Sequence, residues 1–338
     1  MNQREESEII GFGRRQFLQY SGIAAAALFL KKNGGFAMAN DASRVALLKT
    51  ENREYGVRAS LGALKVNPVK GKDVLIKPNF NTADLTPGST HNDTLAALVK
   101  EAWNMGAKSI RLGERSYPPT REVMEKKGIL PIMEKMGVQV IDFDGLGNKD
   151  WVAFKPQKSH WANGFRIARP ILDAECLIST CCLKTHQFGG FFTMSLKLHV
   201  GVVPTSRHGY EYMKDLHSSP HQRKMIAEIN EPFRPALVVL DGIDAFVDGG
   251  PATGKRAKGE VFLASTDRVA IDAVGVAILK LLGSNEAIMK TKIFEQEQIA
   301  RAAELGLGAS SPSAIEIIAA DENSREYRDR VVEVLMKS

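Results

Sequence analysis

Short apolar runs alternate along the chain with longer segments in which apolar residues recur every three or four positions. Short runs are typical of buried strands, and the longer repeat is typical of amphipathic helices. Strands are expected at residues 45–48, 73–76, 109–112, 138–141, 176–179, 236–240, 261–264 and 315–318. Helices are expected at residues 55–64, 121–127, 130–136, 267–282 and 290–305, with a further one after residue 90 and a last one ending at Leu335. This order predicts an α/β fold with three layers: a mostly parallel sheet with helices on both faces.

Two stretches need a separate interpretation. The helix after residue 90 has Thr90 or Asn92 as its candidate N-cap, because either side chain can accept a hydrogen bond from a free backbone N–H, and Gly106 ends it. Residues 143–170 break the alternation, since tryptophan and phenylalanine are spread there among proline, lysine and glycine. We expect an irregular or antiparallel excursion near 143–170.

The first 39 residues have the features of an export signal. Arg14 and Arg15 precede an apolar run at 21–30, and Ala37 and Ala39 form the A-x-A pattern of a signal-peptidase site. The arginine pair resembles the twin-arginine (Tat) signal of bacteria. This resemblance implies export of a folded protein by the Tat translocase, cleavage after the signal and a periplasmic location. The alternative is an uncleaved anchor, although ten apolar residues fall short of the ~20 that span a bilayer.

The predicted mature chain, a single α/β domain at 40–338, is nearly balanced in charge. Removing residues 1–39 takes away five of the 45 basic and three of the 39 acidic residues, which leaves 40 against 36. A surplus this small, without a basic tract interleaved with aromatics, disfavours nucleic acid as a partner. No other apolar run approaches spanning length, so no stable membrane span is expected after cleavage. Small anionic ligands remain compatible with this composition.

Cysteine occurs at three positions, Cys176, Cys181 and Cys182. The number and spacing do not match a disulfide framework, and no four-cysteine pattern for an iron–sulfur cluster is present in this chain alone. We expect the cysteines to be small buried residues. A disulfide between Cys176 and Cys181 is the alternative, and it requires the intervening chain to turn back.

Polar side chains suited to holding an anion follow four of the predicted strands. In open α/β sheets, ligands bind beyond the carboxyl ends of the strands, where such side chains converge. Lysine, histidine and carboxylate together can bind an anion, move protons or bind a metal ion. The side chains are, in chain order, Lys77, Asn79, Glu114, Arg115, Lys184, His186 and Asp241.

The segment that begins at Lys184 has the composition of an anion-binding cradle. Lys184 and His186 lie two residues apart and share one face if the segment is extended. Gly189 allows close backbone approach, and Thr193 and Lys197 supply further donors. Neither the G-x-x-x-x-G-K-[ST] loop nor a G-x-G-x-x-G turn after a strand is present, so no nucleotide-binding motif supports a nucleotide ligand.

Two groups of residues could hold a metal ion. His199, His208, His217 and His221 lie close together in the sequence, but their spacing matches no zinc motif, and solvated or hydrogen-bonded histidines are the competing interpretation. Asp241 and Asp248 would suit a divalent ion such as Mg²⁺ or Ca²⁺. The structural alternatives are a turn role for Asp248 and an N-cap role for Asp267, which precedes a predicted helix.

Several of these motifs, in this order, resemble the domain of unknown function 362 family of bacteria and archaea. The resemblance covers about residues 73–283 and implies Lys184, His186, Lys197, Asp241 and Asp248 as site residues, without implying a reaction. Some family members resemble this domain fused to ferredoxin-type cysteine clusters, which this chain lacks. The motifs are Lys77-Pro78-Asn79, Thr90-His91, Lys184-Thr185-His186, Thr193-x-x-x-Lys197, Asp241-Gly242-Ile243, Gly250-Pro251-x-x-Gly254 and Asp267-Arg268-Val269-Ala270-Ile271-Asp272. The chain departs from the family pattern at Leu198, where asparagine is usual, and at Asp248, where glutamate is common.

Three hypotheses follow. In the first, the chain is an enzyme that binds an anionic small molecule: lysines at 77, 184 and 197 neutralise it, Asn79 and Thr193 bind it, and His186 with Lys184 performs the catalysis. In this hypothesis Asp241 and Asp248 hold a divalent ion or orient the histidine. In the second, the chain binds a metal or cofactor, or helps to mature one, for a periplasmic redox partner without turnover. In the third, it is a structural protein of the cell envelope. Substrate, reaction, metal and oligomeric state stay open.

Overall fold

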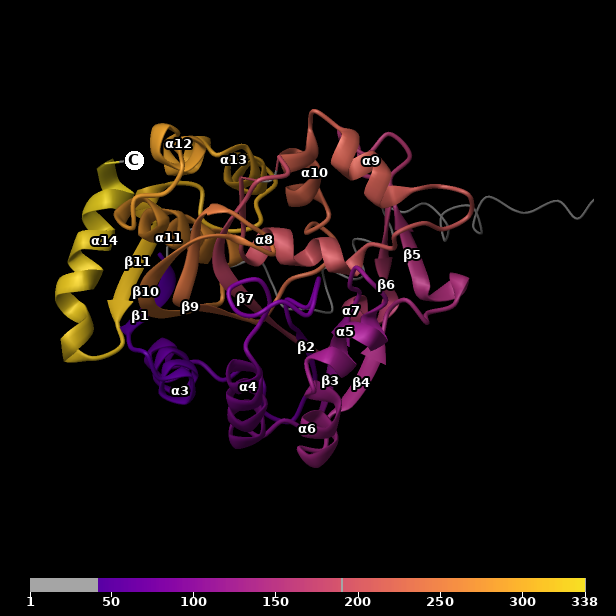
Figure 1. Ribbon diagram of the computed structural model, residues 1–338, viewed down its shortest axis with the longest axis horizontal. Helices are drawn as coiled ribbons and strands as arrows, with labels where there is room; N and C mark the ends of the chain where they lie inside the picture. Colours follow the sequence, from indigo (N-terminus) through magenta and orange to yellow (C-terminus); the bar gives the residue numbers. More distant parts are fainter. Residues whose placement is uncertain (1–41, 190, 338) are drawn as a thin grey trace, which may run out of the picture. The chain divides into compact units, whose positions relative to one another are not determined.

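Nine strands form one mixed sheet in residues 42–189 and 191–337, the part of the chain that this computed structural model describes (Figure 1). Their order across the sheet is β11-β1-β10-β9-β7-β2-β3-β4, with β8 paired to β7. The strands are β1 (Ser43–Lys49), β2 (Asp73–Lys77), β3 (Ser109–Glu114), β4 (Gln139–Asp142), β7 (Cys176–His186), β8 (Phe191–Thr193), β9 (Leu237–Gly249), β10 (Gly254–Ser265) and β11 (Ile315–Ala319). The export signal predicted for residues 1–39, with Arg14, Arg15, Ala37 and Ala39, lies outside the described residues.

Parallel pairing dominates the sheet, as the sequence predicts. Strands β4, β3, β2, β7 and β9 pair in parallel with their neighbours, and β1 pairs in parallel with β11. Strand β10 is antiparallel to both β1 and β9, because a tight turn joins β9 directly to β10. Gly249 and Gly250 adopt φ values of +76° and +73° in that turn, a conformation that favours glycine.

Helices cover both faces of the sheet (Figure 1). The helices are α3 (Arg53–Leu64), α4 (Asn92–Asn104), α5 (Thr120–Lys126), α6 (Ile129–Lys135), α7 (Arg169–Leu172), α8 (Ser195–Leu198), α9 (Tyr212–Ser218), α10 (Gln222–Glu228), α11 (Arg268–Leu281), α12 (Glu286–Lys290), α13 (Glu297–Glu304) and α14 (Arg325–Lys337). In Figure 1, helices α3, α4 and α6 lie on one side of the sheet, and α8, α11 and α13 lie on the other. The three-layer α/β architecture is therefore confirmed.

Strand β1 illustrates why the apolar runs are continuous. Val45 and Leu47 belong to the core under α11 and α14, whereas Ala46 and Leu48 belong to the core under α3 and α4. Successive side chains of a strand point to opposite faces, so a strand that is buried on both faces must be apolar at every position.

No helix in residues 42–189 or 191–337 has the length and apolarity needed to cross a membrane.

The excursion after β4 is an antiparallel pair, β5 (Trp151–Phe154) and β6 (Phe165–Ala168). A buried carboxylate attaches it to the domain: Glu228 at the end of α10 binds His160 Nδ1 at 2.6 Å and accepts a hydrogen bond from Arg301 Nε at 3.0 Å. The prediction of an antiparallel excursion near 143–170 is confirmed.

Several predicted boundaries are wrong; strand β10, for example, begins at Gly254 and not at residue 261. Strands β7 and β9 continue well beyond residues 179 and 240. Lys184 and Asp241, which suggested a loop after those positions, are buried with protein partners. The helix expected at 290–305 is divided into a short turn and α13. The N-cap of α4 is neither Thr90 nor Asn92 but His91, whose Nδ1 accepts the N–H of Asp93 at 3.1 Å.

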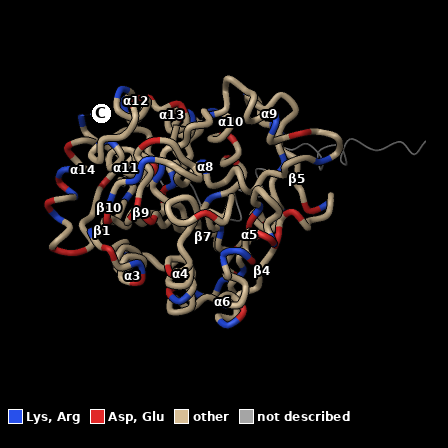
Figure 2. Tube along the Cα trace, in the orientation of Figure 1, with Lys and Arg blue, Asp and Glu red and all other residues tan. Residues whose placement is uncertain are grey.

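Positions of basic and acidic residues alternate along the outer helices (Figure 2). No long run of a single sign is visible along the trace in this view. An electrostatic preference of the protein for a charged ligand must therefore come from a local cluster of charged side chains.

Candidate functional site

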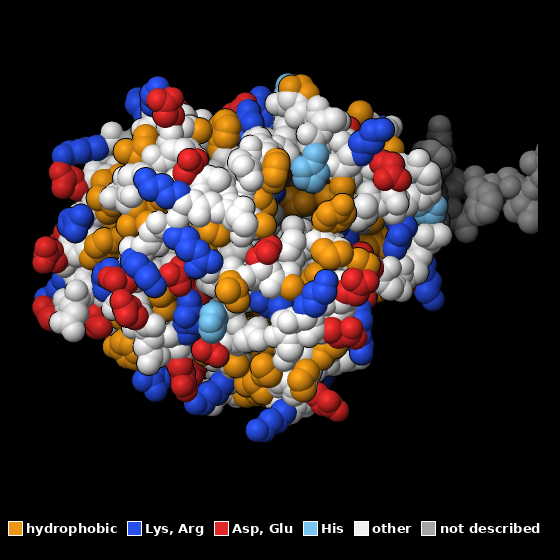
Figure 3. Space-filling view, viewed as in Figure 1, with side chains coloured by type: hydrophobic (Ala, Val, Ile, Leu, Met, Phe, Trp, Pro, Cys, Tyr) orange, Lys and Arg blue, Asp and Glu red, His pale blue; other side chains and the backbone are white. Residues whose placement is uncertain are grey.

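A cavity of about 490 Å³ lies at the carboxyl ends of β2, β3 and β7. Lys77, Glu114 and His186 are the last residues of these three strands. Strands β3 and β4 follow β2 on one side of it in the sheet, whereas β7 pairs with β2 on its other side. The strand order therefore reverses at β2. Ligand crevices of open α/β sheets form at such a reversal of strand order. The space-filling view shows a hollow in the surface in the region of α8 and α9 (Figure 3).

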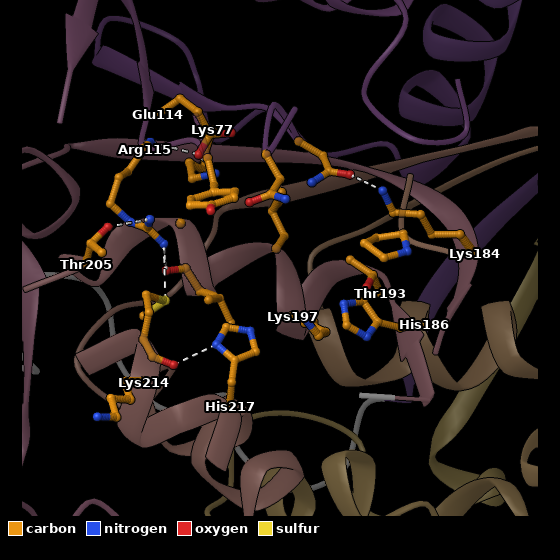
Figure 4. A pocket seen from close by; sticks show the side chains of 18 residues that line it. Lys77, Glu114, Arg115, Lys184, His186, Thr193, Lys197, Thr205, Lys214 and His217 are labelled. Atoms are coloured by element: carbon orange, nitrogen blue, oxygen red, sulfur yellow. Dashed lines mark hydrogen bonds and ion pairs between the residues drawn. The ribbon is translucent and has the colours of Figure 1, made fainter. Parts of the chain in front are cut away.

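Most of the anion-binding residues predicted from the sequence line this cavity (Figure 4). The charged or titratable lining residues comprise five basic side chains, two histidines, a tyrosine and one carboxylate. They are Lys77, Glu114, Arg115, Tyr117, Lys184, His186, Lys197, Lys214 and His217. Asn79, Thr193 and Thr205 add uncharged polar groups.

Lys77 is already neutralised within the protein. Its Nζ lies 2.5 Å from Oε1 of Glu114, and both side chains are almost completely buried. Burial lowers the pKa of Lys77 and raises the pKa of Glu114, while the attraction between them opposes both changes. The pair carries no net charge with the proton on either partner. Gly201 makes room for it, because a Cβ there would lie 2.6 Å from Oε1 of Glu114.

Lys184 also has protein partners. Its Nζ donates to Oδ1 of Asn79 at 2.8 Å and to the carbonyl oxygen of Gly88 at 2.5 Å. Burial lowers its pKa. These bonds tie the end of β7 to the loop after β2, where the N–H of Asn79 donates to Oγ1 of Thr90 at 2.9 Å. Lys184 therefore builds the cavity wall in addition to contributing charge.

Arg115 supplies a fixed positive charge. Its Nη1 donates to Oγ1 of Thr205 at 3.1 Å, and its Nη2 donates to the carbonyl oxygen of Val200 at 3.2 Å. Burial lowers its pKa, but a guanidinium stays protonated in proteins. Within the described residues its Nε has no hydrogen-bond partner.

Lys197 differs from the other buried lysines. It lies on α8, it is 8% exposed, and its Nζ makes no hydrogen bond or ion pair with any described residue. Burial, and after it the charge of Lys184, lowers its pKa to about 7. Asp272 of α11 positions this short helix, because its carboxylate accepts the N–H groups of Ser195 at 2.7 Å and Leu196 at 3.0 Å.

Two further lining residues, His186 and Thr193, each carry a polar atom that is unpaired within the described residues (Figure 4). Nδ1 of His186 and Oγ1 of Thr193 are both buried and lack a hydrogen-bond partner in the part of the chain that is described. Burial, followed by the charges of Lys197 and Lys184, lowers the pKa of His186 to about 2. A ring with this pKa is neutral at physiological pH, so it is suited to hydrogen bonding and not to the acid–base role predicted from the sequence.

The arrangement favours a negatively charged, hydrogen-bonding ligand. With Lys77 cancelled by Glu114, the cationic side chains of the lining are Arg115, Lys184, Lys197 and the exposed Lys214. Buried polar groups are normally hydrogen-bonded. Nδ1 of His186 and Oγ1 of Thr193, which have no partner among the described residues, could be satisfied by a ligand beside Lys197.

Asp241 and Asp248 do not meet, which corrects the predicted metal site. Asp241 is fully buried between α3 and α4, where its Oδ2 accepts from Arg53 Nε at 3.0 Å and from Thr94 Oγ1 at 2.6 Å. Asp248 is an exposed residue near the end of β9 and accepts the N–H of Gly249 at 2.9 Å. Six residues of the same strand lie between the two aspartates. No group of three or more His, Cys, Asp or Glu side chains suited to a metal ion occurs in residues 42–189 and 191–337.

The four clustered histidines also separate. His217 lines the cavity. His199 is buried elsewhere, and its ring is hydrogen-bonded to Oγ of Ser179 at 2.9 Å and to Oδ1 of Asn230 at 2.7 Å. For this residue, a hydrogen-bonded histidine is therefore observed and not a metal ligand. His208 and His221 do not line the cavity. Gly189 does not line it either; its φ of +77° allows the turn between β7 and β8.

The two predicted structural roles are observed. Asp267 caps α11 by accepting the N–H groups of Val269 at 2.7 Å and Ala270 at 3.0 Å. Cys176, Cys181 and Cys182 are buried free thiols, and burial raises the pKa of Cys182 to about 12, so this thiol is unreactive.

Sequence reasoning missed four residues that line the cavity. Thr205, Met213 and Lys214 come from the segment after α8 and follow no predicted strand, and Tyr117 lies in the loop after β3. The one available signal was the i, i+3 spacing of Lys214 and His217, which places them on one face of α9. The pairing of Lys77 with Glu114 had no sequence signal, because it joins two different strands.

Comparison with known proteins identifies the family. The model of the domain of unknown function DUF362 matches residues 74–277, which is more than half of the chain and includes β3 to β10. The chain belongs to the DUF362 family. The family resemblance seen in the motifs is thereby confirmed, with nearly the limits predicted.

Two other proteins are similar to this DUF362 chain. The thylakoid-associated protein sll1697 of Synechocystis sp. (strain ATCC 27184 / PCC 6803 / Kazusa) is 29% identical over 248 residues, which cover 70% of this chain and 74% of that protein. The lactate racemase apoprotein from Thermoanaerobacterium thermosaccharolyticum superposes with a TM-score of 0.39 and 16% identity, over 62% of this chain and 53% of that chain. A structural similarity of this size carries no functional argument.

Proposed function

We propose that the cavity at the ends of β2, β3 and β7 binds a small organic anion, and that this DUF362 protein is an enzyme acting on it. The observation that carries the proposal is the wall made by His186, Thr193 and Lys197. Nδ1 of His186 and Oγ1 of Thr193 are buried without a partner among the described residues, and the buried Lys197 makes no ion pair with any of them. A buried cation that lacks a counter-ion is costly. An anionic ligand would supply the missing counter-ion and hydrogen-bond partners together.

The size of the cavity supports a small molecule. Its volume of about 490 Å³ falls within the range of roughly 300–1,000 Å³ that is usual for small-molecule sites. The face that contains the hollow carries basic and acidic side chains together (Figure 3), which does not suit a polyanion such as nucleic acid.

We assign different tasks to the cationic residues. Arg115 and Lys184 are held by protein oxygen atoms and provide a fixed positive field. Lys197 has a pKa of about 7, and a group that titrates near the working pH is best suited to exchange a proton with a bound substrate. His186 and Thr193 would hydrogen-bond the ligand. This assignment moves proton transfer from His186 to Lys197.

Thermal unfolding in the presence of anions tests the proposal. Phosphate, acetate and succinate are compared with chloride at equal ionic strength, and at least one should raise the melting temperature of the wild-type protein more than chloride does. Lys197→Met should abolish this gain, because it removes the unpaired charge. A gain of equal size in the variant, or no gain in the wild type, would contradict the proposal.

Lys100→Met is the matched control. Lys100 is an exposed lysine that pairs with Glu54 on the surface, at 2.6 Å, and exposed pairs contribute little to stability. This variant should keep the full response to the anion. Loss of the response in both variants would indicate a nonspecific effect of lysine replacement.

We also propose that the protein reaches the periplasm by the Tat route, a hypothesis that rests on the sequence of residues 1–39. Replacing both Arg14 and Arg15 with lysine should leave full-length protein in the cytoplasm. Cell fractionation checks this, and processed protein in the periplasm of the double variant would reject it.

A further inference from the structure

We propose that Lys197 is a nucleophile that forms an imine with the carbonyl carbon of an oxo acid. This inference rests on the proposed function and narrows it, because it names the ligand class as an anion that carries an aldehyde or ketone next to its carboxylate. The catalytic atom is Nζ of Lys197.

The other lysines of the cavity are unsuited to this role. Nζ of Lys77 is held by Glu114 at 2.5 Å and also donates to the carbonyl oxygen of Pro78 at 2.9 Å. Nζ of Lys184 donates to two oxygen atoms. Lys214 is exposed on α9, so it lacks the desolvation that activates an amine. Among the lining lysines, Lys197 is buried and has no acceptor in the described part of the chain.

The surroundings of Lys197 favour the neutral amine that nucleophilic attack requires. An amine is activated when it is desolvated or lies near another cation. Burial and the charge of Lys184 together lower the pKa of Lys197 to about 7. The other titratable groups around α8 and the cavity do not raise the pKa of Lys197 back to its ordinary value. They are Lys77 paired with Glu114, Arg115, Tyr117, His186, Lys214, His217, and Asp272, which is occupied by backbone N–H groups of α8.

The cavity wall next to Lys197 carries side chains that can bind the carboxylate and the carbonyl oxygen of an oxo acid. A carboxylate requires a cation that stays charged, and Arg115 and Lys184 line the same cavity. The carbonyl oxygen becomes a hydroxyl group during attack and needs hydrogen-bond partners. Oγ1 of Thr193 and the ring of His186 are unpaired on this wall and can both donate and accept.

The chemistry balances without an oxidant or reductant. The lone pair of Nζ forms a bond to the carbonyl carbon while the π pair of the carbonyl moves to oxygen. A proton lost from nitrogen and one gained by oxygen give a carbinolamine. The carbon–oxygen bond then breaks, the hydroxyl group leaves with a proton as water, and the nitrogen lone pair forms the imine. One amine and one carbonyl thus give one imine and one water.

Reductive trapping tests the inference. Wild-type protein is incubated separately with glyoxylate, pyruvate and 2-oxoglutarate in the presence of cyanoborohydride, and the modified lysines are located by peptide mass spectrometry. At least one oxo acid should label Lys197 roughly tenfold or more faster than the exposed Lys100, because binding places the reactants together. The rate of labelling should rise as the pH passes through about 7, where the amine loses its proton.

Two variants separate this inference from the proposed function. Lys197→Arg keeps the positive charge but cannot form an imine, so it should retain stabilisation by anions and lose the fast label. Lys197→Met should lose both. If anions stabilise the wild type while no oxo acid labels Lys197 faster than Lys100, the imine is rejected and anion binding stands. If neither effect is seen, both proposals fail.

Discussion

Replacing Lys197 with methionine should make the unliganded protein more stable. Methionine has a similar length and keeps the apolar contacts of the side chain but removes a buried ammonium group that has no partner among the described residues. The pKa of Lys197 falls from its ordinary value of 10.5 to about 7, and each pKa unit corresponds to ~1.4 kcal/mol. The charged form therefore costs the folded state at most about 5 kcal/mol, and we expect the variant to gain about 2–5 kcal/mol.

The gain should depend on pH in a defined direction. A base whose pKa is lowered by folding destabilises the folded state wherever the unfolded chain holds the proton. The cost is complete below about pH 7 and disappears as the pH rises toward 10.5. The difference in the free energy of unfolding between variant and wild type should thus be largest in acid and vanish in alkali.

Urea unfolding near pH ~6 and near pH ~10 measures this difference. Lys184→Met is the matched control with the opposite expected sign. It would leave Oδ1 of Asn79 and the carbonyl oxygen of Gly88 without their donor, at a cost of about 1–3 kcal/mol. If Lys197→Met is destabilising at both pH values, Lys197 serves the fold, and the reasoning that reserves it for a ligand is refuted.

Three further predictions concern residues that support the site. Asp267→Ala removes the cap of α11 and should lower the free energy of unfolding by about 2–4 kcal/mol, measured by urea unfolding; a change below ~0.5 kcal/mol would contradict the capping role. Gly201→Ala places a methyl group 2.6 Å from Glu114 and should reduce both the melting temperature and the response to anions, and an unchanged response would argue against a close fit. Burial raises the pKa of Asp272 from 3.8 to about 7, so its favourable contribution is complete below pH 3.8 and is lost as the pH rises through 7. Asp272→Asn should flatten this part of the stability profile, and an unchanged profile would place that titration elsewhere.

The layers of the fold and the rim of the sheet could be predicted from the sequence alone. Strands that are buried on both faces need apolar residues at every position, and helices need them on one face, so the two patterns reveal the alternation of elements. The carboxyl ends of neighbouring parallel strands lie together, which is why Lys77, Lys184 and His186 were expected at one rim and lie at one cavity.

The tertiary structure decided which of these polar residues is available to a ligand. Lys77 forms an ion pair with Glu114, and Asp241 forms one with Arg53 of α3. Lys197 forms no ion pair with any described residue. The charge that a side chain offers depends on burial and on partners that are distant in sequence. Residue types and spacing therefore determined the fold class and where the polar residues converge, and three-dimensional packing determined which lysine is left unpaired.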